Sequence, residues 1–331
     1  MTQTYRAFVV RKEDDATQLG YEERHVPEPQ DGEVVVQIAW SCVNYKDGLA
    51  TLPKGGVVRA WPRVPGVDMS GVVAASRDDR FREGDQVVCT GFDFGVNHDG
   101  GFAELCRVPG DWLFHRPDGL SLRDCMTFGT AGFTAALAVQ QMERNGLAPD
   151  NGEVLVTGAS GGVGSMAVAM LANLGYRVAA ATGKTDAATF LTGLGAETIL
   201  SREEVSAEPR PIGKARWAGA VDQVGGRILA WTLSTMAYRG VCAATGLTGG
   251  PGLESTVFPF ILRGVSLLGI DSVMCPMAER GPLWSRMAGE LRPSDLGSIT
   301  TEIGFDDLET SLATILKGGV TGRTVVRVAG D

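Results

Sequence analysis

The stretch Glu153-Val-Leu-Val-Thr-Gly158-Ala-Ser-Gly161-Gly162-Val-Gly164 has the pattern of a strand followed by a glycine turn and the start of a helix. The strand is apolar on both faces, as in a parallel sheet covered by helices. The glycines allow close backbone approach, and the helix expected over residues 162–174 directs its positive N-terminus at the turn. This arrangement predicts a dinucleotide-binding fold. The alternative, a turn that serves only packing, leaves four glycines within seven residues unexplained.

The next predicted strand indicates which nicotinamide coenzyme is bound. It covers residues 176–182 and ends in Thr182-Gly183-Lys184, where an NAD-binding protein usually places Asp or Glu for the ribose 2′-hydroxyl. A hydroxyl and a cation suit a 2′-phosphate instead, and one charge-assisted contact contributes about 1.5–3 kcal/mol. The sequence therefore predicts NADPH. Lys184 could instead be a solvated residue that opens the next helix.

Composition limits the classes of partner. The 331 residues are 44% hydrophobic with a net charge of -9, enough for two domains with their own cores. Basic residues are scattered, so we expect neither a nucleic-acid nor a membrane partner. No signal-peptide pattern and no run of about 18 apolar residues is present, so we expect a cytoplasmic enzyme. Six dispersed cysteines predict reduced, mostly buried thiols.

The order of elements predicts an α/β chain in which one domain is built from both ends. Short β runs fill residues 5–113 and predict a barrel-like unit. From about residue 122, helices alternate with strands, as in a parallel sheet. Strands are expected over residues 7–10, 33–40, 71–75, 86–89, 103–108, 176–182, 198–200, 219–222, 240–245, 265–270 and 322–328. Helices are expected over residues 123–132, 133–145, 162–174, 226–238 and 306–317.

Several strings match a known family over nearly the whole chain. They include Asn44-Tyr45-Lys46-Asp47, Gly100-Gly101-Phe102-Ala103-Glu104, Gly129-Thr130-Ala131-Gly132, Trp217-Ala-Gly-Ala-Val-Asp222 and Gly322-Arg323-Thr324. The chain resembles the medium-chain dehydrogenase/reductase superfamily, in its zinc-independent quinone oxidoreductase branch, and is similar to NADPH-dependent acrylyl-CoA reductases. The resemblance implies a GroES-like catalytic domain over residues 1–123 and 271–331 and a doubly wound Rossmann domain over residues 124–270. It also implies hydride transfer from NADPH to acrylyl-CoA, giving propionyl-CoA.

The resemblance also bears on zinc. Zinc-dependent relatives carry a cysteine in the place of Asn44 and a His-Glu pair in the place of Val67-Asp68. Those ligands are missing here, and the chain has only three histidines and no four closely spaced cysteines. We therefore expect no metal.

Without a metal, hydrogen-bond donors must stabilise the enolate charge that develops on an unsaturated substrate. The resemblance places Tyr45 at the cleft floor beside the nicotinamide, where it could orient coenzyme or substrate. Asn44 could donate to the thioester oxygen, and Asp47 could fix the loop. Packing, a turn and a helix cap are the respective alternatives for these three residues.

The remaining site residues are carried over from the family by position. The predicted coenzyme contacts are Tyr45, Ser160, Gly161, Gly162, Val163, Thr182, Gly183, Lys184, Arg202, Leu247, Ile261, Ser272 and Arg323. The related reductases carry Ser-Gly-Arg where this chain has Thr-Gly-Lys, which keeps the hydroxyl and the charge but loses the bidentate fork. Arg202 could compensate, or be a solvated surface residue, and Leu247 and Ile261 could be ordinary core. The CoA portion needs cations, for which Arg59, Arg63, Arg263 and Arg323 are candidates.

Three functions remain open. The first is reduction of acrylyl-CoA or a related enoyl thioester, the second is reduction of quinones or free enones, and the third is NADPH binding without turnover. Residues 265–270 could form the outermost strand of the sheet and pair with a second copy, so we expect a homodimer, although the same segment could instead be covered within one chain.

Overall fold

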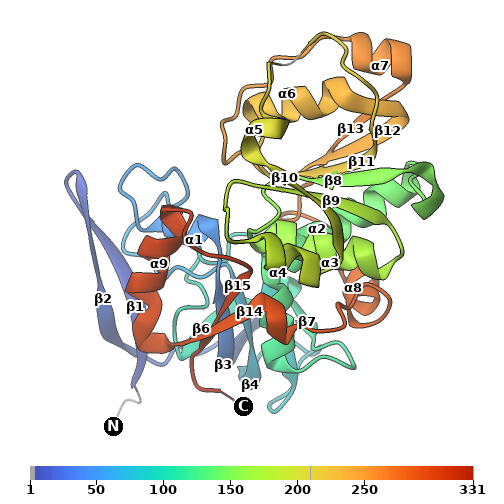
Figure 1. Cartoon of the computed structure of the whole chain (residues 1–331). Coiled ribbons are helices and arrows are strands. Elements are labelled where there is room, and N and C mark those ends of the chain that lie inside the picture. The colour runs from blue at the N-terminus through green and yellow to red at the C-terminus, as the bar shows by residue number, and fades with distance from the viewer. Residues whose placement is uncertain (1–3, 209, 331) are drawn as a thin grey trace. The chain divides into compact units, whose positions relative to one another are not determined.

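The structure is a computed structural model that describes residues 4–208 and 210–330 (Figure 1). Two compact units are present. The first comprises Met1–Thr130, Val273–Ala288 and Leu296–Asp331, and the second comprises Ala131–Ser272 and Gly289–Asp295. The sequence-based boundaries, at 123/124 and 270/271, differ from these by a few residues, and the assignment of the units as catalytic and coenzyme domains stays a prediction.

The first unit is β-rich. A hairpin forms from β1 (Thr4–Glu13) and β2 (Ala16–His25), and a separate seven-stranded sheet has the order β14-β15-β3-β4-β5-β7, with β6 also paired to β3. The strands of that sheet are β3 (Glu33–Val43), β4 (Asp68–Ser76), β5 (Gln86–Thr90), β6 (Leu105–Pro109), β7 (Leu113–His115), β14 (Thr300–Gly304) and β15 (Arg323–Arg327). The predicted return of the C-terminal strand to the β unit is confirmed, because β15 pairs with β3.

Three α-helices lie wholly within the first unit. They are α1 (Tyr45–Ala50), α8 (Met277–Ala288) and α9 (Leu308–Leu316). Leu308 and Leu312 of α9 pack with Phe8 of β1 in one apolar cluster, beside the hairpin (Figure 1). This packing explains why a C-terminal helix belongs to a unit that begins at the N-terminus.

The second unit contains a six-stranded parallel sheet in the order β10-β9-β8-β11-β12-β13. Its strands are β8 (Glu153–Val156), β9 (Arg177–Thr182), β10 (Ala196–Ser201), β11 (Trp217–Asp222), β12 (Met236–Ala244) and β13 (Ser266–Gly269). The order reverses direction between β8 and β11, as in a dinucleotide-binding sheet. The predicted α/β class with a parallel sheet is confirmed.

Helices cover both faces of this sheet. They are α3 (Gly162–Asn173), α4 (Ala188–Gly193), α5 (Arg202–Val205), α6 (Gly226–Thr235) and α7 (Phe258–Arg263). Val205 of α5 and Leu229 of α6 pack with Leu155 of β8, and α3 covers the opposite face (Figure 1). The strand that begins the coenzyme motif is therefore buried on both sides, as its composition predicts.

Some predicted boundaries are wrong. The helix expected over residues 226–238 ends at Thr235, and residues 236–239 already belong to β12. The two helices expected over residues 123–145 form one element, α2 (Leu122–Arg144), which is interrupted at Gly129 rather than between residues 132 and 133. The ranges predicted from sequence do not include β2, β7, β14, α1, α4, α5, α7 or α8.

The predictions about the cysteines and about membrane-spanning segments concern the whole chain. All six cysteines are free and buried, which confirms the prediction that the thiols are mostly buried, and their reduced state stays a prediction. Among the described residues, no helix has both the length and the apolar character that crossing a membrane requires.

Candidate functional site

The glycine turn follows β8 directly. Gly158 adopts a φ of +57°, a conformation that glycine accepts without strain. A Cβ atom on Gly164 would lie 2.4 Å from the carbonyl oxygen of Gly158, so α3 can pack this closely on the turn only with glycine at that position. The spacing of the glycines is thus explained by one left-handed turn and one close helix contact.

The N-terminus of α3 is suited to an anion. Its N-cap is Gly161, and no side chain among the described residues caps it. A Cβ atom on Gly161 would meet only the Gly158 oxygen, at 3.4 Å, so the space beside it is open. The first amides of a helix lack intrahelical partners and carry the positive end of its dipole. The predicted residues Ser160, Gly161, Gly162 and Val163 therefore fit a pyrophosphate.

The end of β9 presents two hydroxyls and two cations. The hydroxyls of Ser160 and Thr182, both buried, lie 2.9 Å apart, and the Thr182 oxygen accepts from the backbone N–H of Lys184 at 3.1 Å. The guanidinium of Arg202 packs on Gly183, since a Cβ atom there would lie 2.5 Å from Arg202 Nη2. The structure thus brings the predicted 2′-phosphate residues together.

The electrostatics at Lys184 favour an anion. Burial lowers the pKa of this half-buried ammonium, and the negative charge of Asp186 offsets only part of that effect. A phosphate beside Lys184 would stabilise its charged form. These residues fit the adenosine end of NADPH.

The other predicted coenzyme residues of the second unit differ in environment. Leu247 and Ile261 are 63% and 68% exposed, which rules out the alternative that they are ordinary core. Ser272 is buried and accepts a hydrogen bond from the Thr134 hydroxyl at 2.7 Å. Asp222 is the buried last residue of β11, and its carboxylate accepts hydrogen bonds from the Thr157 hydroxyl and from the backbone N–H of Gly225 in the following turn.

Asn44 lies at the centre of a buried polar cluster in the first unit. Its side-chain amide donates to Asp68 at 2.8 Å and to Asp47 at 3.2 Å, and its oxygen accepts from Arg323 at 3.2 Å. Both amide hydrogens are therefore occupied by carboxylates. The predicted donation from Asn44 to a substrate oxygen would require one of these bonds to break, so the contacts favour a positioning role.

Asp47 fixes the loop that precedes β4. Its carboxylate accepts from the backbone N–H groups of Asn44 at 2.8 Å, Gly66 at 3.2 Å and Val67 at 2.9 Å. Burial, and then the negative charge of Asp68, raise the pKa of Asp47 to about 7 despite these donors. This carboxyl group is hydrogen-bonded on both oxygens and buried, which agrees with the loop-fixing role suggested for it.

Tyr45 and Arg323, both predicted as coenzyme contacts, are placed in contrasting environments. Tyr45 begins α1 and is 43% exposed, so its side chain is not core packing. Arg323 is 2% exposed, and it donates to the carbonyl oxygen of Thr127 and to Cys42 Sγ as well as to Asn44. Arg323 therefore supports the cluster from within the unit.

The candidate cations for CoA are also placed differently. Arg263 donates to carbonyl oxygens of Ser234, Met236 and Gly213 and so anchors the end of α7. Arg63 pairs with Asp99, and Arg59 is exposed. Of the four candidates, Arg263 and Arg323 already donate hydrogen bonds inside the protein. Their contacts are those of structural residues and not of surface cations that bind CoA.

The cluster also contains Asp68, Thr130 and Gly129, three residues with no role predicted from sequence. Asp68 accepts from the hydroxyl of Thr130 at 2.5 Å and from its backbone N–H at 2.9 Å. A Cβ atom on Gly129 would lie within 3 Å of Cys42, Asp68 and Arg323, so the kink in α2 and the cluster require each other. The strings that contain these residues matched the family, but the contacts between Asp68 and Thr130 span 62 positions and have no local signal.

No group of three or more His, Cys, Asp or Glu side chains in the described parts of the chain is arranged to hold a metal ion. The expected absence of a metal stays a prediction.

Burial raises the pKa of the Cys42 thiol well above its ordinary value, and the charge of Asp68 adds to this effect. Cys42 is therefore a neutral hydrogen-bonding member of the cluster.

Comparison with known proteins identifies the family. Residues 30–118 match the family model of the alcohol dehydrogenase GroES-like domain, and residues 162–288 match that of zinc-binding dehydrogenase. The chain is 49% identical over 327 residues to the acrylyl-CoA reductase AcuI of Ruegeria pomeroyi, covering 98% of this chain and 99% of the relative. It is 49% identical over 302 residues to YhfP of Bacillus subtilis, named as a quinone oxidoreductase, covering 91% of each chain.

Solved structures agree with this comparison. The yhdH oxidoreductase of Salmonella enterica in complex with NADP is 47% identical and superposes with a TM-score of 0.95, over 98% of this chain and 99% of that one. The Bacillus subtilis protein yhfP with NAD bound is 45% identical, with a TM-score of 0.96, over 99% and 100% of the two chains. The chain therefore belongs to the medium-chain dehydrogenase/reductase superfamily, in the branch that contains quinone oxidoreductases and acrylyl-CoA reductases.

Proposed function

We propose that the protein reduces the carbon-carbon double bond of acrylyl-CoA with NADPH, giving propionyl-CoA. The similarity to an acrylyl-CoA reductase over 98% of the chain carries this proposal. The geometry of the second unit supports the coenzyme part of it, because an uncapped helix end and two cations follow neighbouring parallel strands.

The coenzyme would be held along the end of the parallel sheet. The amides of residues 161–163 would bind the pyrophosphate, and Thr182, Lys184 and Arg202 would bind the 2′-phosphate. The proposed set of coenzyme residues is completed by Ser160, Gly183, Leu247, Ile261, Ser272 and Tyr45. The predicted contact from Arg323 is not retained, because this residue is 2% exposed and its guanidinium donates within the buried cluster. When bound, NADPH supplies a hydride for the β-carbon of the substrate, while the α-carbon gains a proton.

The first unit would position the substrate end of the reaction. Tyr45 is the exposed member of its segment, and we assign to it the orientation of coenzyme or substrate. Asn44 and Asp47 hold the start of α1 in place through their shared contacts. Their role is to keep Tyr45 fixed, because interactions that stabilise a transition state must be arranged before the reaction begins.

Reduction of quinones or free enones is the second candidate. The relative YhfP, named as a quinone oxidoreductase, matches this chain with the same percentage identity as the acrylyl-CoA reductase. The coenzyme machinery would be shared, and only the acceptor would differ.

One assay separates these functions. NADPH oxidation is followed with acrylyl-CoA, crotonyl-CoA, a quinone and a free enone at matched concentrations, and the thioester product is identified by mass spectrometry. We expect the highest kcat/KM for acrylyl-CoA, with propionyl-CoA as the product. Turnover of the quinone, without turnover of acrylyl-CoA or crotonyl-CoA, would support the second candidate. Coenzyme binding without oxidation by any acceptor would support the non-catalytic alternative.

A further inference from the structure

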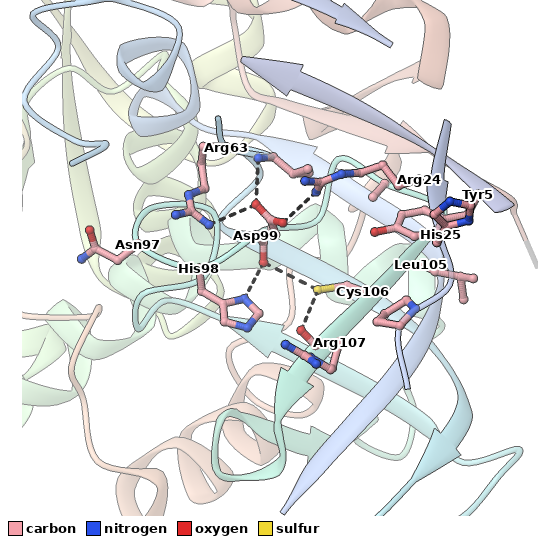
Figure 2. A pocket seen from close by; sticks show the side chains of 14 residues that line it. Tyr5, Arg24, His25, Arg63, Asn97, His98, Asp99, Leu105, Cys106 and Arg107 are labelled. Carbon is pink, nitrogen blue, oxygen red and sulfur yellow. Dashed lines mark hydrogen bonds and ion pairs between the residues drawn. The ribbon is translucent and has the colours of Figure 1, made fainter. Parts of the chain in front are cut away.

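The β-rich unit contains a cavity that none of the proposed catalytic or coenzyme residues lines. It has a volume of about 440 Å³ and lies beside β1, β2, β6 and the loop over residues 97–100 (Figure 2). The charged and imidazole side chains of its wall are Arg24, Arg63, Arg107, His25, His98 and Asp99. The lining therefore contains three guanidinium groups and a single carboxylate.

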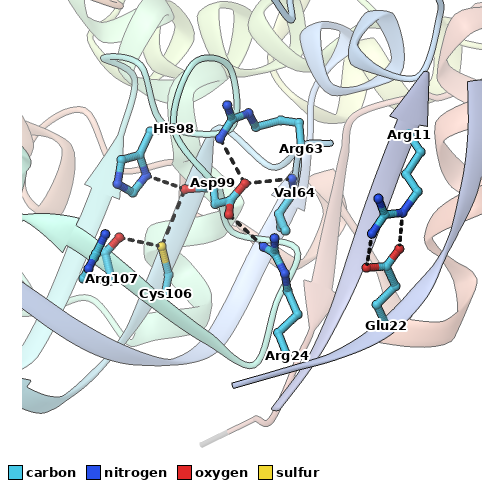
Figure 3. A network of polar contacts seen from close by, with 9 residues as sticks. All are labelled: Arg11, Glu22, Arg24, Arg63, Val64, His98, Asp99, Cys106 and Arg107. Carbon is cyan, nitrogen blue, oxygen red and sulfur yellow. Dashed lines mark hydrogen bonds and ion pairs between the residues drawn. The ribbon is translucent and has the colours of Figure 1, made fainter. Parts of the chain in front are cut away.

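That carboxylate is already occupied. Arg24 Nη1 donates to one oxygen of Asp99 at 2.7 Å, and the other oxygen accepts from Arg63 Nη1 at 3.0 Å and from the Val64 backbone N–H at 3.1 Å (Figure 3). Burial opposes ionisation of Asp99, but the Val64 N–H and the two guanidinium groups outweigh it and lower its pKa. Asp99 thus stays charged, and one negative charge is shared between two positive ones.

Arg63 has a donor that remains unsatisfied. Its side chain is only 13% exposed, and its Nε is buried with no hydrogen-bond partner among the described residues. A buried donor without an acceptor is unfavourable, so an acceptor belongs at this position. No second carboxylate lines the cavity within the described chain, which makes the site unsuited to a cation.

Arg107 adds a further positive group on another wall. Its Nε lies 3.3 Å from Glu33, a residue outside the lining, and its side chain remains 38% exposed. Figure 2 shows Arg24 and Arg63 meeting Asp99 from two sides, with His98 and Arg107 nearby. Planar guanidinium groups that approach from different walls match the several oxygens of a phosphoryl group.

We propose that this cavity binds the phosphoryl dianion of a small phosphate monoester. A volume of about 440 Å³ exceeds what a phosphate ion fills, which leaves room for the body of the ester. The phosphoryl group could come from a free metabolite or from the CoA portion of a thioester, since both present the same chemistry to these arginines.

The test uses the full chain saturated with NADPH, so that the coenzyme site is filled. Binding of D-ribose 5-phosphate, D-ribose and inorganic phosphate is measured by calorimetry. We expect saturable binding of ribose 5-phosphate with one site per chain, weaker binding of inorganic phosphate and none of ribose. Propionyl-CoA is then added to identify the source of the phosphoryl group. If propionyl-CoA displaces ribose 5-phosphate, the cavity binds a phosphoryl group of CoA. If it does not, the cavity binds a separate phosphorylated metabolite.

Variants locate the binding. Arg63→Gln and Arg107→Gln should each weaken the binding of ribose 5-phosphate at least tenfold, and Arg107→Gln leaves the Asp99 contacts intact. Arg11→Gln is the matched control, because Arg11 lies on β1 and pairs with Glu22 of β2 outside the cavity (Figure 3). Absence of saturable binding, equal binding of ribose, or affinity unchanged in both cavity variants would overturn the proposal.

Discussion

Lys184 is the residue on which the choice of coenzyme most depends. It follows β9 at the position where an acidic side chain would favour NADH, its side chain is half-buried, and its backbone N–H donates to the Thr182 hydroxyl. The related structures include one with NADP and one with NAD, so family membership alone does not decide the preference. The side chains at the end of β9 must decide it.

The first prediction reverses the charge at this position. Lys184→Glu should weaken NADPH binding at least tenfold, because a carboxylate repels the 2′-phosphate, while NADH binding changes little or improves. Dissociation constants for both coenzymes from fluorescence titration check this. Lys214→Glu, an exposed substitution elsewhere in the second unit, is the control for net charge. Equal losses for NADPH and NADH would place the 2′-phosphate elsewhere.

The second prediction concerns Gly183. A Cβ atom there would lie 2.5 Å from the guanidinium of Arg202, so Gly183→Ala should displace the end of that flexible side chain. We expect weaker NADPH binding and an unchanged melting temperature, since the clash involves no backbone atom. Arg202→Gln should have a similar effect, and the double variant should lose little more than either single variant. Fully additive losses would show that Gly183 acts independently of Arg202.

At the scale of elements, the interruption of α2 joins the helix to the buried cluster. Gly129 has a φ of +49° and a ψ of -157°, and the atoms nearest to a Cβ placed on it would belong to Cys42, Asp68 and Arg323. The kink allows the carboxylate of Asp68 to accept from Thr130 in the same helix. The cluster therefore holds α1, β4, α2 and β15 together with side chains rather than backbone pairing alone.

The third prediction follows from this kink. Gly129→Ala should lower the free energy of unfolding by several kcal/mol, because backbone strain of about 1–3 kcal/mol adds to a clash with three buried side chains. Gly193→Ala, at the exposed end of α4 with no atom within 4 Å of its Cβ position, should be neutral or stabilise by about 0.5–1 kcal/mol. Urea unfolding of both variants tests the contrast, and equal stabilities would contradict it.

The fourth prediction is a pH dependence. The pKa of Asp47 is raised from 3.8 to about 7, so the folded chain keeps a proton that the unfolded chain loses. Folding then takes up a proton between about pH 4 and pH 7, and this contribution to the free energy of unfolding falls as pH rises through that window. In Asp47→Asn the contribution should disappear, so that the difference from wild type changes between pH 5 and pH 7.

Asp99→Asn is the control for that measurement. The pKa of Asp99 is lowered, so its titration lies below the window and the slope between pH 5 and pH 7 should match that of wild type. Parallel profiles for wild type and Asp47→Asn would contradict the assignment of the proton to Asp47.

Elements with local sequence signals were predictable, whereas contacts between distant residues were not. The strand, turn and helix around Gly158 were predictable because their signals lie within a dozen residues. The cluster around Asn44 was not, since Asn44 and Arg323 are 279 positions apart and nothing local indicates their contact. Strand β2 was missed because it is largely polar and has no fully buried residue, and the early start of β12 depends on pairing between Trp217 and Met236.

At the scale of the whole molecule, the two edges of the parallel sheet differ. The edge strand β10 carries Glu197 with an exposed side chain, a charge that discourages pairing with another strand. The other edge, β13, has the sequence Ser-Leu-Leu-Gly and no charge. The adjoining helix α7 exposes Phe258, Ile261 and Leu262, each by more than 40%. An uncharged edge beside exposed apolar side chains is suited to a second copy of the chain.

The fifth prediction is therefore a homodimer through β13 and α7. At micromolar concentration the 34.9 kDa chain should elute as a species of about 70 kDa, twice its own mass. Leu262→Asp should shift the population toward the monomer, because it places a charge on a face that association would bury. Leu52→Asp, at an exposed site in the first unit, should leave the mass unchanged. A wild-type chain that elutes at 34.9 kDa would show that this edge remains open in solution.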